Sequence, residues 1–198
     1  PSSLTTIGDL AFCYCINLRE LTLPSSLTTI GDYAFLGCTN LRELTVPSGV
    51  KIGKKAFEYG ISVTLTASSS GSISIGNYFA TDDYTINTTT LIIAEGATFV
   101  NIEDNDEYCK LSIFLPSTLK EVQGLYNLKY SYGGSEYYYN NTIYCAAKAV
   151  PKGFSDAFFK IPDNYKDIAY KIYVPSSSYG AYRSALPERY YYDNNYYI

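Results

Sequence analysis

The chain repeats itself with a period of 23 residues, and no other feature limits its fold as strongly. The segment PSSLTTIGDLAFCYCINLRELTL at 1–23 is followed by PSSLTTIGDYAFLGCTNLRELTV at 24–46, and 18 of these 23 positions are identical. A third copy begins at Pro47, lacks one residue and keeps the motif as IGKKAF. Such a chain is expected to fold as stacked copies of one unit, because a single unit cannot bury its own apolar side.

Each copy contains a short strand and a turn. In Leu18–Leu23 and Leu41–Val46 apolar residues alternate with Thr, so that Leu21 and Leu23 are expected to point inward. The proline that follows lacks an amide donor and ends each strand. The segment Ile7–Phe12 suits one irregular or helical turn with its apolar side toward the core. The period and this order predict a leucine-rich-repeat solenoid, a β-rich, right-handed superhelix of 23-residue rungs with short helical turns.

Weaker copies of the repeat continue to about residue 125. The IGNYF that closes Thr64–Phe79 resembles a shortened IGDYAF, and Leu91–Val100 predicts a strand, a turn and a second strand. Ser112–Val122 again shows the strand–Pro–Ser order of the first copies. We therefore expect residues 1–125 to form the solenoid, regular to about residue 60 and degenerate beyond it.

Residues 126–198 have a different composition and hold 17 of the 23 tyrosines. Thr142–Cys145 and Lys171–Pro175 predict two more strands, and Ser178–Leu186 predicts a short helix. A solenoid needs an atypical closing unit to cover its last repeat. We expect residues 126–198 to supply this Tyr-rich C-terminal cap, continuous with the solenoid.

Charge and hydropathy argue against nucleic acid as a partner and against a membrane-spanning segment. The net charge is −4, and the 15 Lys and Arg residues form no cluster that could follow the phosphates of a nucleic acid. No apolar run approaches the roughly 20 residues that span a bilayer. The chain begins at Pro1 within the repeat pattern, so we expect it to be a fragment whose targeting signal lies outside it.

The residue types also argue against catalysis. The chain has no histidine, which removes Ser-His-Asp and Cys-His nucleophiles and any histidine-containing zinc site. Ser117–Lys120 matches the S-x-x-K pattern of serine acyl-enzymes, but it lies at a strand–turn position of the repeat without a K-T-G or S-D-N motif. No pair among the 19 acidic residues stands out for glycoside hydrolysis. We expect a protein that is not an enzyme and needs no cofactor.

Two smaller patterns concern metal binding and thiols. The run Glu103–Glu107 places Asp104 and Asp106 two residues apart, as candidates for a calcium site, but it lacks the glycine and distal glutamate of a full calcium loop. A solvated loop is the alternative. Cys15 and Cys38 occupy the same position in successive repeats, which predicts a column of buried thiols, with a disulfide as the alternative.

Two surfaces of the expected solenoid suit ligand binding. On the sheet face, outward side chains of the first two repeats would lie above one another, either as a specific contact surface or as a merely solvated ladder. In the Tyr-rich part, three consecutive tyrosines must divide between two faces of a strand, either as contact area for proteins and sugar rings or as core of the cap. The candidate residues are Arg19, Glu20, Thr22, Arg42, Glu43, Thr45, Tyr137, Tyr138 and Tyr139.

The repeat LPSSLTTIGDYAFLGCTNLRELTVP and the later segments TIYCAAKAVPK and KIYVPSSSYGAYRSAL resemble the BspA-like leucine-rich-repeat proteins, which bacteria of gut and mouth secrete or anchor at their surface. The resemblance implies an extracellular or cell-surface adhesion module that binds proteins or glycans of a host or extracellular surface. The Tyr runs and residues 64–110 depart from the family pattern and leave the ligand open. The alternative is a structural spacer or cap domain of a larger surface protein, with no ligand of its own.

Overall fold

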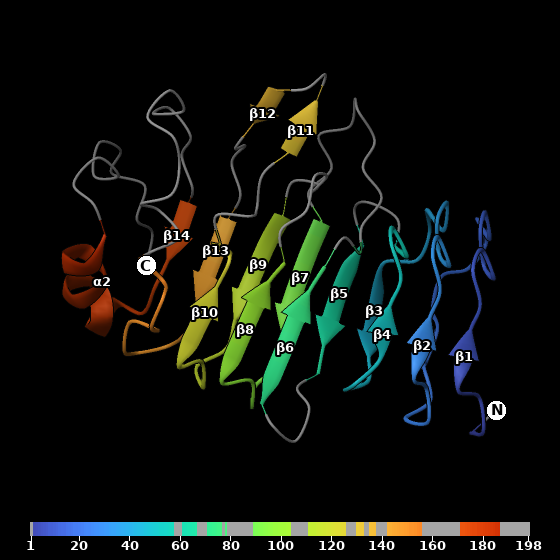
Figure 1. Ribbon diagram of the computed structural model, residues 1–198, viewed down its shortest axis with the longest axis horizontal. Coiled ribbons are helices and arrows are strands. Elements are labelled where there is room, and N and C mark those ends of the chain that lie inside the picture. The colour runs from blue at the N-terminus through green and yellow to red at the C-terminus, as the bar shows by residue number, and fades with distance from the viewer. Residues whose placement is uncertain are drawn as a thin grey trace.

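The computed structural model describes residues 2–57, 61–66, 71–76, 78, 89–103, 111–125, 130–132, 135–137, 142–155 and 171–186. From β2 to β10, strands of a six-stranded parallel sheet alternate along the sequence with strands of an opposite layer. Figure 1 shows the ladders as two layers, with the N-terminal strands at one end and the single labelled helix at the other.

One layer is a six-stranded parallel sheet in the order β14-β13-β9-β7-β5-β3. Inward residues alternate with outward ones along these strands, so one face of the sheet is buried and the other is not. The strands are β3 (Glu43–Val46), β5 (Ser62–Leu65), β7 (Thr89–Ile93), β9 (Leu111–Leu115), β13 (Thr142–Cys145) and β14 (Lys171–Tyr173).

The opposite layer consists of two separate three-stranded parallel sheets, β1-β2-β4 and β10-β8-β6. Successive repeats contribute its strands, but β4 and β6 do not pair. The strands are β1 (Thr6–Ile7), β2 (Thr29–Ile30), β4 (Lys51–Ile52), β6 (Ser72–Ile75), β8 (Phe99–Ile102) and β10 (Glu121–Gln123).

The remaining elements lie toward the C-terminus. The strands β11 (Tyr130–Tyr132) and β12 (Ser135–Tyr137) form an antiparallel pair, and the short helices η3 (Ser176–Ser178) and α2 (Tyr179–Ala185) follow β14. The strands expected in 91–100, 112–122, 142–145 and 171–175 and the helix expected in 178–186 are therefore confirmed. The sequence correctly predicts a β-rich repeat fold.

The core lies between the two layers and is continuous through the described repeats. At one repeat position, Phe12, Phe35 and Phe57 form a stack, with ring centroids 5.2 and 6.0 Å apart. The strand register places Thr29 23 residues after Thr6, Lys51 22 residues after Thr29, and Phe99 27 residues after Ser72. The spacing becomes uneven where the sequence repeat decays.

The strand expected over Leu18–Leu23 is not formed, and that prediction is wrong. The burial pattern is nevertheless the expected one, because Leu23 is buried while Thr22 is exposed. Leu18 and Leu21 stay partly exposed, whereas Leu41 and Leu44 at the corresponding positions of the second repeat are buried. The less well packed segment forms no ladder with the second repeat, and the six-stranded sheet starts at β3.

The IGD motif links each repeat to the next through a side chain. The Asp9 carboxylate accepts a hydrogen bond from the Asp32 backbone N–H at 2.8 Å, and the Asp32 carboxylate accepts one from the Lys54 N–H at 2.8 Å. A Cβ atom at Gly31 would collide with the Asp9 carboxylate, and one at Gly53 would collide with that of Asp32. Glycine is thus required because the backbone and the aspartate carboxylate of the preceding repeat occupy the space beside it.

At the other end, α2 packs Tyr182 into the core beside β13. The Tyr182 hydroxyl donates to the Ala147 carbonyl at 2.9 Å and lies 3.3 Å from the Cys145 thiol, and the Phe154 ring meets the Tyr182 ring edge-on at 5.2 Å. Burial raises the pKa of Tyr182, and the contact with Cys145 adds to this effect. The phenol therefore stays protonated and keeps its role as a donor.

We expect Gly53→Ala to lower the free energy of unfolding by about 1–3 kcal/mol, because the added methyl group would collide with the backbone of residues 31 and 32 and with the Asp32 carboxylate that accepts from the Lys54 N–H. The matched control is Gly8→Ala, at the same motif position of the first repeat, where nothing lies within 4 Å of the added Cβ. Urea denaturation of both variants measures the difference. Equal stability of the two variants would contradict this role of the glycine.

Candidate binding surface

Two columns of outward positions cross the six-stranded sheet. In the first column the residues in register are Glu43, Ser62, Thr90, Ser112, Thr142 and Lys171. In the second they are Thr45, Thr64, Ile92, Phe114, Tyr144 and Tyr173. The second column thus changes from threonine to aromatic residues toward the C-terminal end.

The aromatic column, which we define as Phe114, Tyr144 and Tyr173, is a continuous stack of rings. The Phe114 and Tyr144 centroids are 4.2 Å apart with planes 5° from parallel, and the Tyr144 and Tyr173 centroids are 4.5 Å apart at 14°. These distances are close to the spacing of about 4.8 Å between paired strands, because each ring stands on its own strand. Phe114 is 36% exposed, and the two tyrosines are partly buried.

This stacking decides which part of each ring a ligand can reach. Both faces of the Tyr144 ring are covered by the neighbouring rings, so its edge and hydroxyl are the parts left for contact. A sugar ring normally stacks on an aromatic face, and both faces of the middle ring of the column are already covered. The arrangement favours contact with side chains of a protein over stacking of successive sugar rings.

A groove of about 430 Å³ runs beside the aromatic column, across the ends of β7, β9, β13 and β14. Besides the three rings, its lining includes Ile92, Pro116, Val174 and Pro175, and Glu95 stands among these apolar residues. A volume of this size lies within the range of about 300–1,000 Å³ found for ligand sites.

Glu95 keeps its negative charge at this groove. Its carboxylate accepts hydrogen bonds from the Ser117 backbone N–H at 3.0 Å and from the Ser117 hydroxyl at 2.9 Å. These bonds lower the pKa of Glu95 below its ordinary value, since both stabilise the ionised form. The groove therefore combines aromatic edges with one fixed carboxylate.

The residues singled out from the sequence fall into three groups. Arg19, Glu20, Thr22, Arg42, Glu43 and Thr45 are all exposed, and Glu43 and Thr45 lie on β3 at the far end of the two columns. Tyr137 belongs to β12, whose backbone alone is described. Tyr138, Tyr139, Asp104 and Asp106 lie outside the described residues.

The aromatic column was not among the predicted binding residues. A signal for it is present in the sequence, because SIFLP, TIYC and KIYVP each place an aromatic residue directly after a buried isoleucine. Aligned on that isoleucine, Phe114, Tyr144 and Tyr173 occupy one outward position of three strands.

The structure describes four of the cysteines and the S-x-x-K segment, and it gives their burial and hydrogen bonds. Cys38 is buried and donates to the Phe12 carbonyl at 3.1 Å, whereas Cys15 is exposed, so the expected column of buried thiols is wrong for Cys15. Cys13, Cys15, Cys38 and Cys145 are all free thiols. Ser117 lies in a turn, as expected, and its hydroxyl donates to Glu95. Within the described ranges, no three Cys, Asp or Glu side chains are grouped as metal ligands.

The repeated side chains, the parallel ladders and the short helix define a β-rich repeat protein. Residues 1–105 match the model of the BspA type leucine rich repeat region in six copies. The chain therefore belongs to the BspA-type leucine-rich-repeat family, which is associated with bacterial surface proteins and whose repeats are typically non-enzymatic protein-binding modules. None of the curated proteins matches the sequence. No helix in the described part is long and apolar enough to cross a membrane.

The stacking of Phe114 on Tyr144 should be measurable as a coupling energy between the two side chains. We expect Phe114→Thr and Tyr144→Thr to be non-additive by about 0.5–1.5 kcal/mol, the usual value for an aromatic pair. A double-mutant cycle from urea denaturation gives this number. Additivity within about 0.3 kcal/mol would mean that the rings do not stack in solution.

Proposed function

We propose that this chain is a protein-binding module of a bacterial cell surface, which binds its ligand on the outer face of the six-stranded sheet. The observation that carries the proposal is the aromatic column beside a groove of about 430 Å³. Aromatic side chains that present a rigid apolar edge with a polar tip are common at the centres of protein interfaces.

We propose a protein segment with basic and apolar side chains as the ligand. The covered ring faces disfavour successive sugar rings, and the ionised Glu95 carboxylate would attract a lysine or arginine at the edge of the groove. Further along the same face, Arg42, Glu43 and Thr45 are exposed and would contact the rest of a long ligand. Arg19, Glu20 and Thr22 would extend this contact, while Tyr137, Tyr138 and Tyr139 form a separate candidate surface.

We further propose that residues 1–125 are a secreted or surface-anchored solenoid of 23-residue rungs and that residues 126–198 are its cap. The helix α2 supports a cap, because its Tyr182 reaches into the core beside β13 at the end of the sheet. A role in adhesion, without catalysis, is supported by the typical behaviour of the family. The host would be a bacterium of gut or mouth.

The test is binding of the purified chain to an array of host matrix proteins and mucosal glycans. We expect binding to a protein, and we expect Phe114→Thr/Tyr144→Thr/Tyr173→Thr to weaken it at least tenfold, about 1.4 kcal/mol. The gentler variant Tyr144→Phe/Tyr173→Phe keeps the rings and removes both hydroxyls. It should fold as the parent does and lose affinity by a smaller factor.

Two control variants separate this surface from the other candidates. Thr45→Ala/Thr64→Ala changes the same column outside the groove and should leave binding within about threefold. Tyr137→Ser/Tyr138→Ser/Tyr139→Ser addresses the other surface. Loss of binding in that variant alone would move the site to the consecutive tyrosines, and an array with no hits would favour the spacer.

A further inference from the structure

The break between β4 and β6 leaves hydrogen-bonding groups of two neighbouring repeats without their ladder partners. Between β2 and β4, the Lys51 N–H donates to the Thr28 carbonyl at 2.9 Å and the Gly53 N–H donates to the Ile30 carbonyl at 2.8 Å. The same register would join the Ser74 N–H to the Val50 carbonyl and the Gly76 N–H to the Ile52 carbonyl. Within the described residues, neither bond is formed.

The two repeats nevertheless stay in contact on both sides of the break. In the opposite layer, β5 and β7 pair over four residues. Just beyond the break, the Phe57 N–H donates to the Tyr78 carbonyl at 2.8 Å. The break is therefore a local opening in one layer, which we call the inter-repeat gap.

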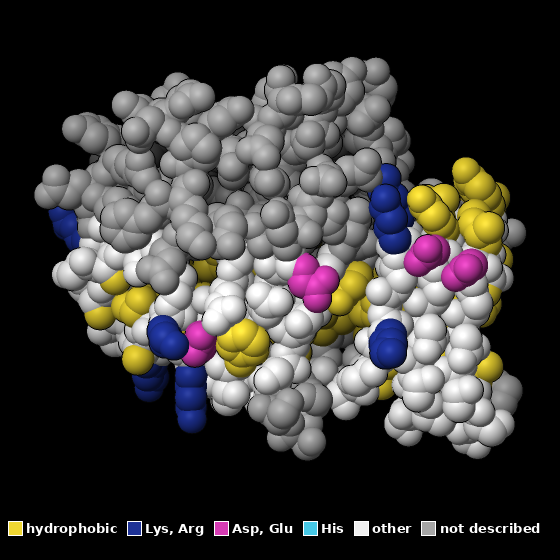
Figure 2. Space-filling model, in the orientation of Figure 1, with side chains coloured by type: hydrophobic (Ala, Val, Ile, Leu, Met, Phe, Trp, Pro, Cys, Tyr) yellow, Lys and Arg dark blue, Asp and Glu magenta, His cyan; other side chains and the backbone are white. Residues whose placement is uncertain are grey.

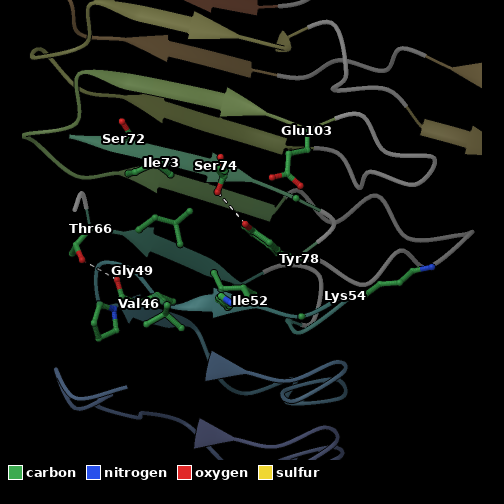
Figure 3. A pocket seen from close by; sticks show the side chains of 16 residues that line it. Val46, Gly49, Ile52, Lys54, Thr66, Ser72, Ile73, Ser74, Tyr78 and Glu103 are labelled. Atoms are coloured by element: carbon green, nitrogen blue, oxygen red, sulfur yellow. Dashed lines mark hydrogen bonds between the residues drawn. The ribbon is translucent and has the colours of Figure 1, made fainter. Parts of the chain in front are cut away.

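The gap is a cavity of about 710 Å³, lined on one side by residues 50–54 and on the other by residues 72–74, 76 and 78. Figure 3 shows Ile52 on one wall and Ile73 and Ser74 on the other, while the Lys54 side chain extends away from the cavity. In Figure 2, apolar side chains are visible in a hollow between the positions of β4 and β6.

The inter-repeat gap leaves Ile52 less buried than the isoleucines at the same position of other repeats. At the repeated isoleucine position, Ile7, Ile30, Ile75 and Ile102 are at most 4% exposed. Ile52, which stands at the same position in β4, is only partly buried. Its backbone N–H would pair with the Ser74 carbonyl in a continuous ladder, but that carbonyl accepts the Tyr78 hydroxyl at 2.9 Å instead.

We propose that the inter-repeat gap accepts a short extended segment of a partner protein as an added parallel strand between β4 and β6. The Val50 and Ile52 carbonyls and the Ser74 and Gly76 N–H groups are the missing ladder contacts that such a strand would make. Its side chains would alternate, with apolar residues in the column of Ile52 and Ile75 and polar ones level with Lys51 and Ser74.

The ladder contacts set the length and the source of the segment. The consecutive residues 50–54 line the cavity along β4, which corresponds to about 16 Å of strand, and the Phe57–Tyr78 bond closes one end. An occupant needs both of its edges free, whereas every strand described in this chain already pairs with at least one neighbour. A separate partner protein therefore fits better than a second copy.

The probe is the capped peptide GSISIG, which copies residues 71–76 and has the required alternation. Its matched control is GSSIIG, which has the same composition but adjacent isoleucines, so that in any register only one of them can enter the apolar column. We expect GSISIG to bind with a Kd below about 1 mM and GSSIIG to bind at least tenfold more weakly, as measured by calorimetry. A GSISIG peptide that is N-methylated at alternate amides should not bind, because it cannot continue the ladder.

Two variants at one position test the site itself. Ser74→Pro removes a backbone N–H that faces the gap. The hydrogen bonds that the Gly71 and Ile75 carbonyls accept on the β8 side remain. This variant should weaken binding of GSISIG at least tenfold. Ser74→Ala keeps the N–H and should bind as the parent does. The variant Phe114→Thr/Tyr144→Thr/Tyr173→Thr should also bind GSISIG normally, which separates this site from the proposed sheet-face site.

Equal binding of GSISIG and GSSIIG would overturn the proposal, since it would indicate a nonspecific apolar pocket. No binding of GSISIG at the highest soluble concentration would overturn it as well, as would equal affinity of the Ser74→Pro and Ser74→Ala variants. Self-association of the chain that GSISIG disrupts would identify a second copy as the occupant, against the partner proposed here.

Discussion

The structure depends on parallel, in-register stacking, which places the same sequence position of one repeat directly beside that of the next. Backbone hydrogen bonds set the spacing between neighbouring repeats, and side chains add to them where the repeat is regular. The carboxylate of Asp9 or Asp32 satisfies a backbone N–H in the following repeat, and the adjacent glycine leaves room for it. Phe12, Phe35 and Phe57 stack for the same reason. A substitution in one repeat therefore acts on its neighbour.

The same stacking gives the two layers different functional properties. The six-stranded sheet is continuous, so its outward positions form unbroken columns, and three aromatic residues in one column become a single rigid surface. The opposite layer is interrupted between β4 and β6, so its strand edges face a cavity. One face thus offers side chains to a ligand, and the other offers backbone groups.

The sequence predicted the fold class because the repeat period and the inward leucines and isoleucines report directly on burial. It was wrong for Leu18–Leu23, where the alternating pattern is present but Leu18 and Leu21 are less well buried than their counterparts and no ladder forms. The aromatic column was missed because Phe114, Tyr144 and Tyr173 come together only through strand register across spacings of about 30 residues. The inter-repeat gap was beyond sequence reasoning, because residues 50–53 and 73–76 resemble other repeats that pair normally.

Native-state amide hydrogen exchange shows whether the six-stranded sheet is continuous while the opposite layer is interrupted between β4 and β6. The Thr90 and Ala94 amides donate across the β5–β7 pair at 3.1 and 3.0 Å and should exchange only on global unfolding. The Ile52 and Ser74 amides face the gap and should exchange at least about 100-fold faster. Equal protection of all four amides would contradict the account, because it would mean that β4 and β6 pair in solution.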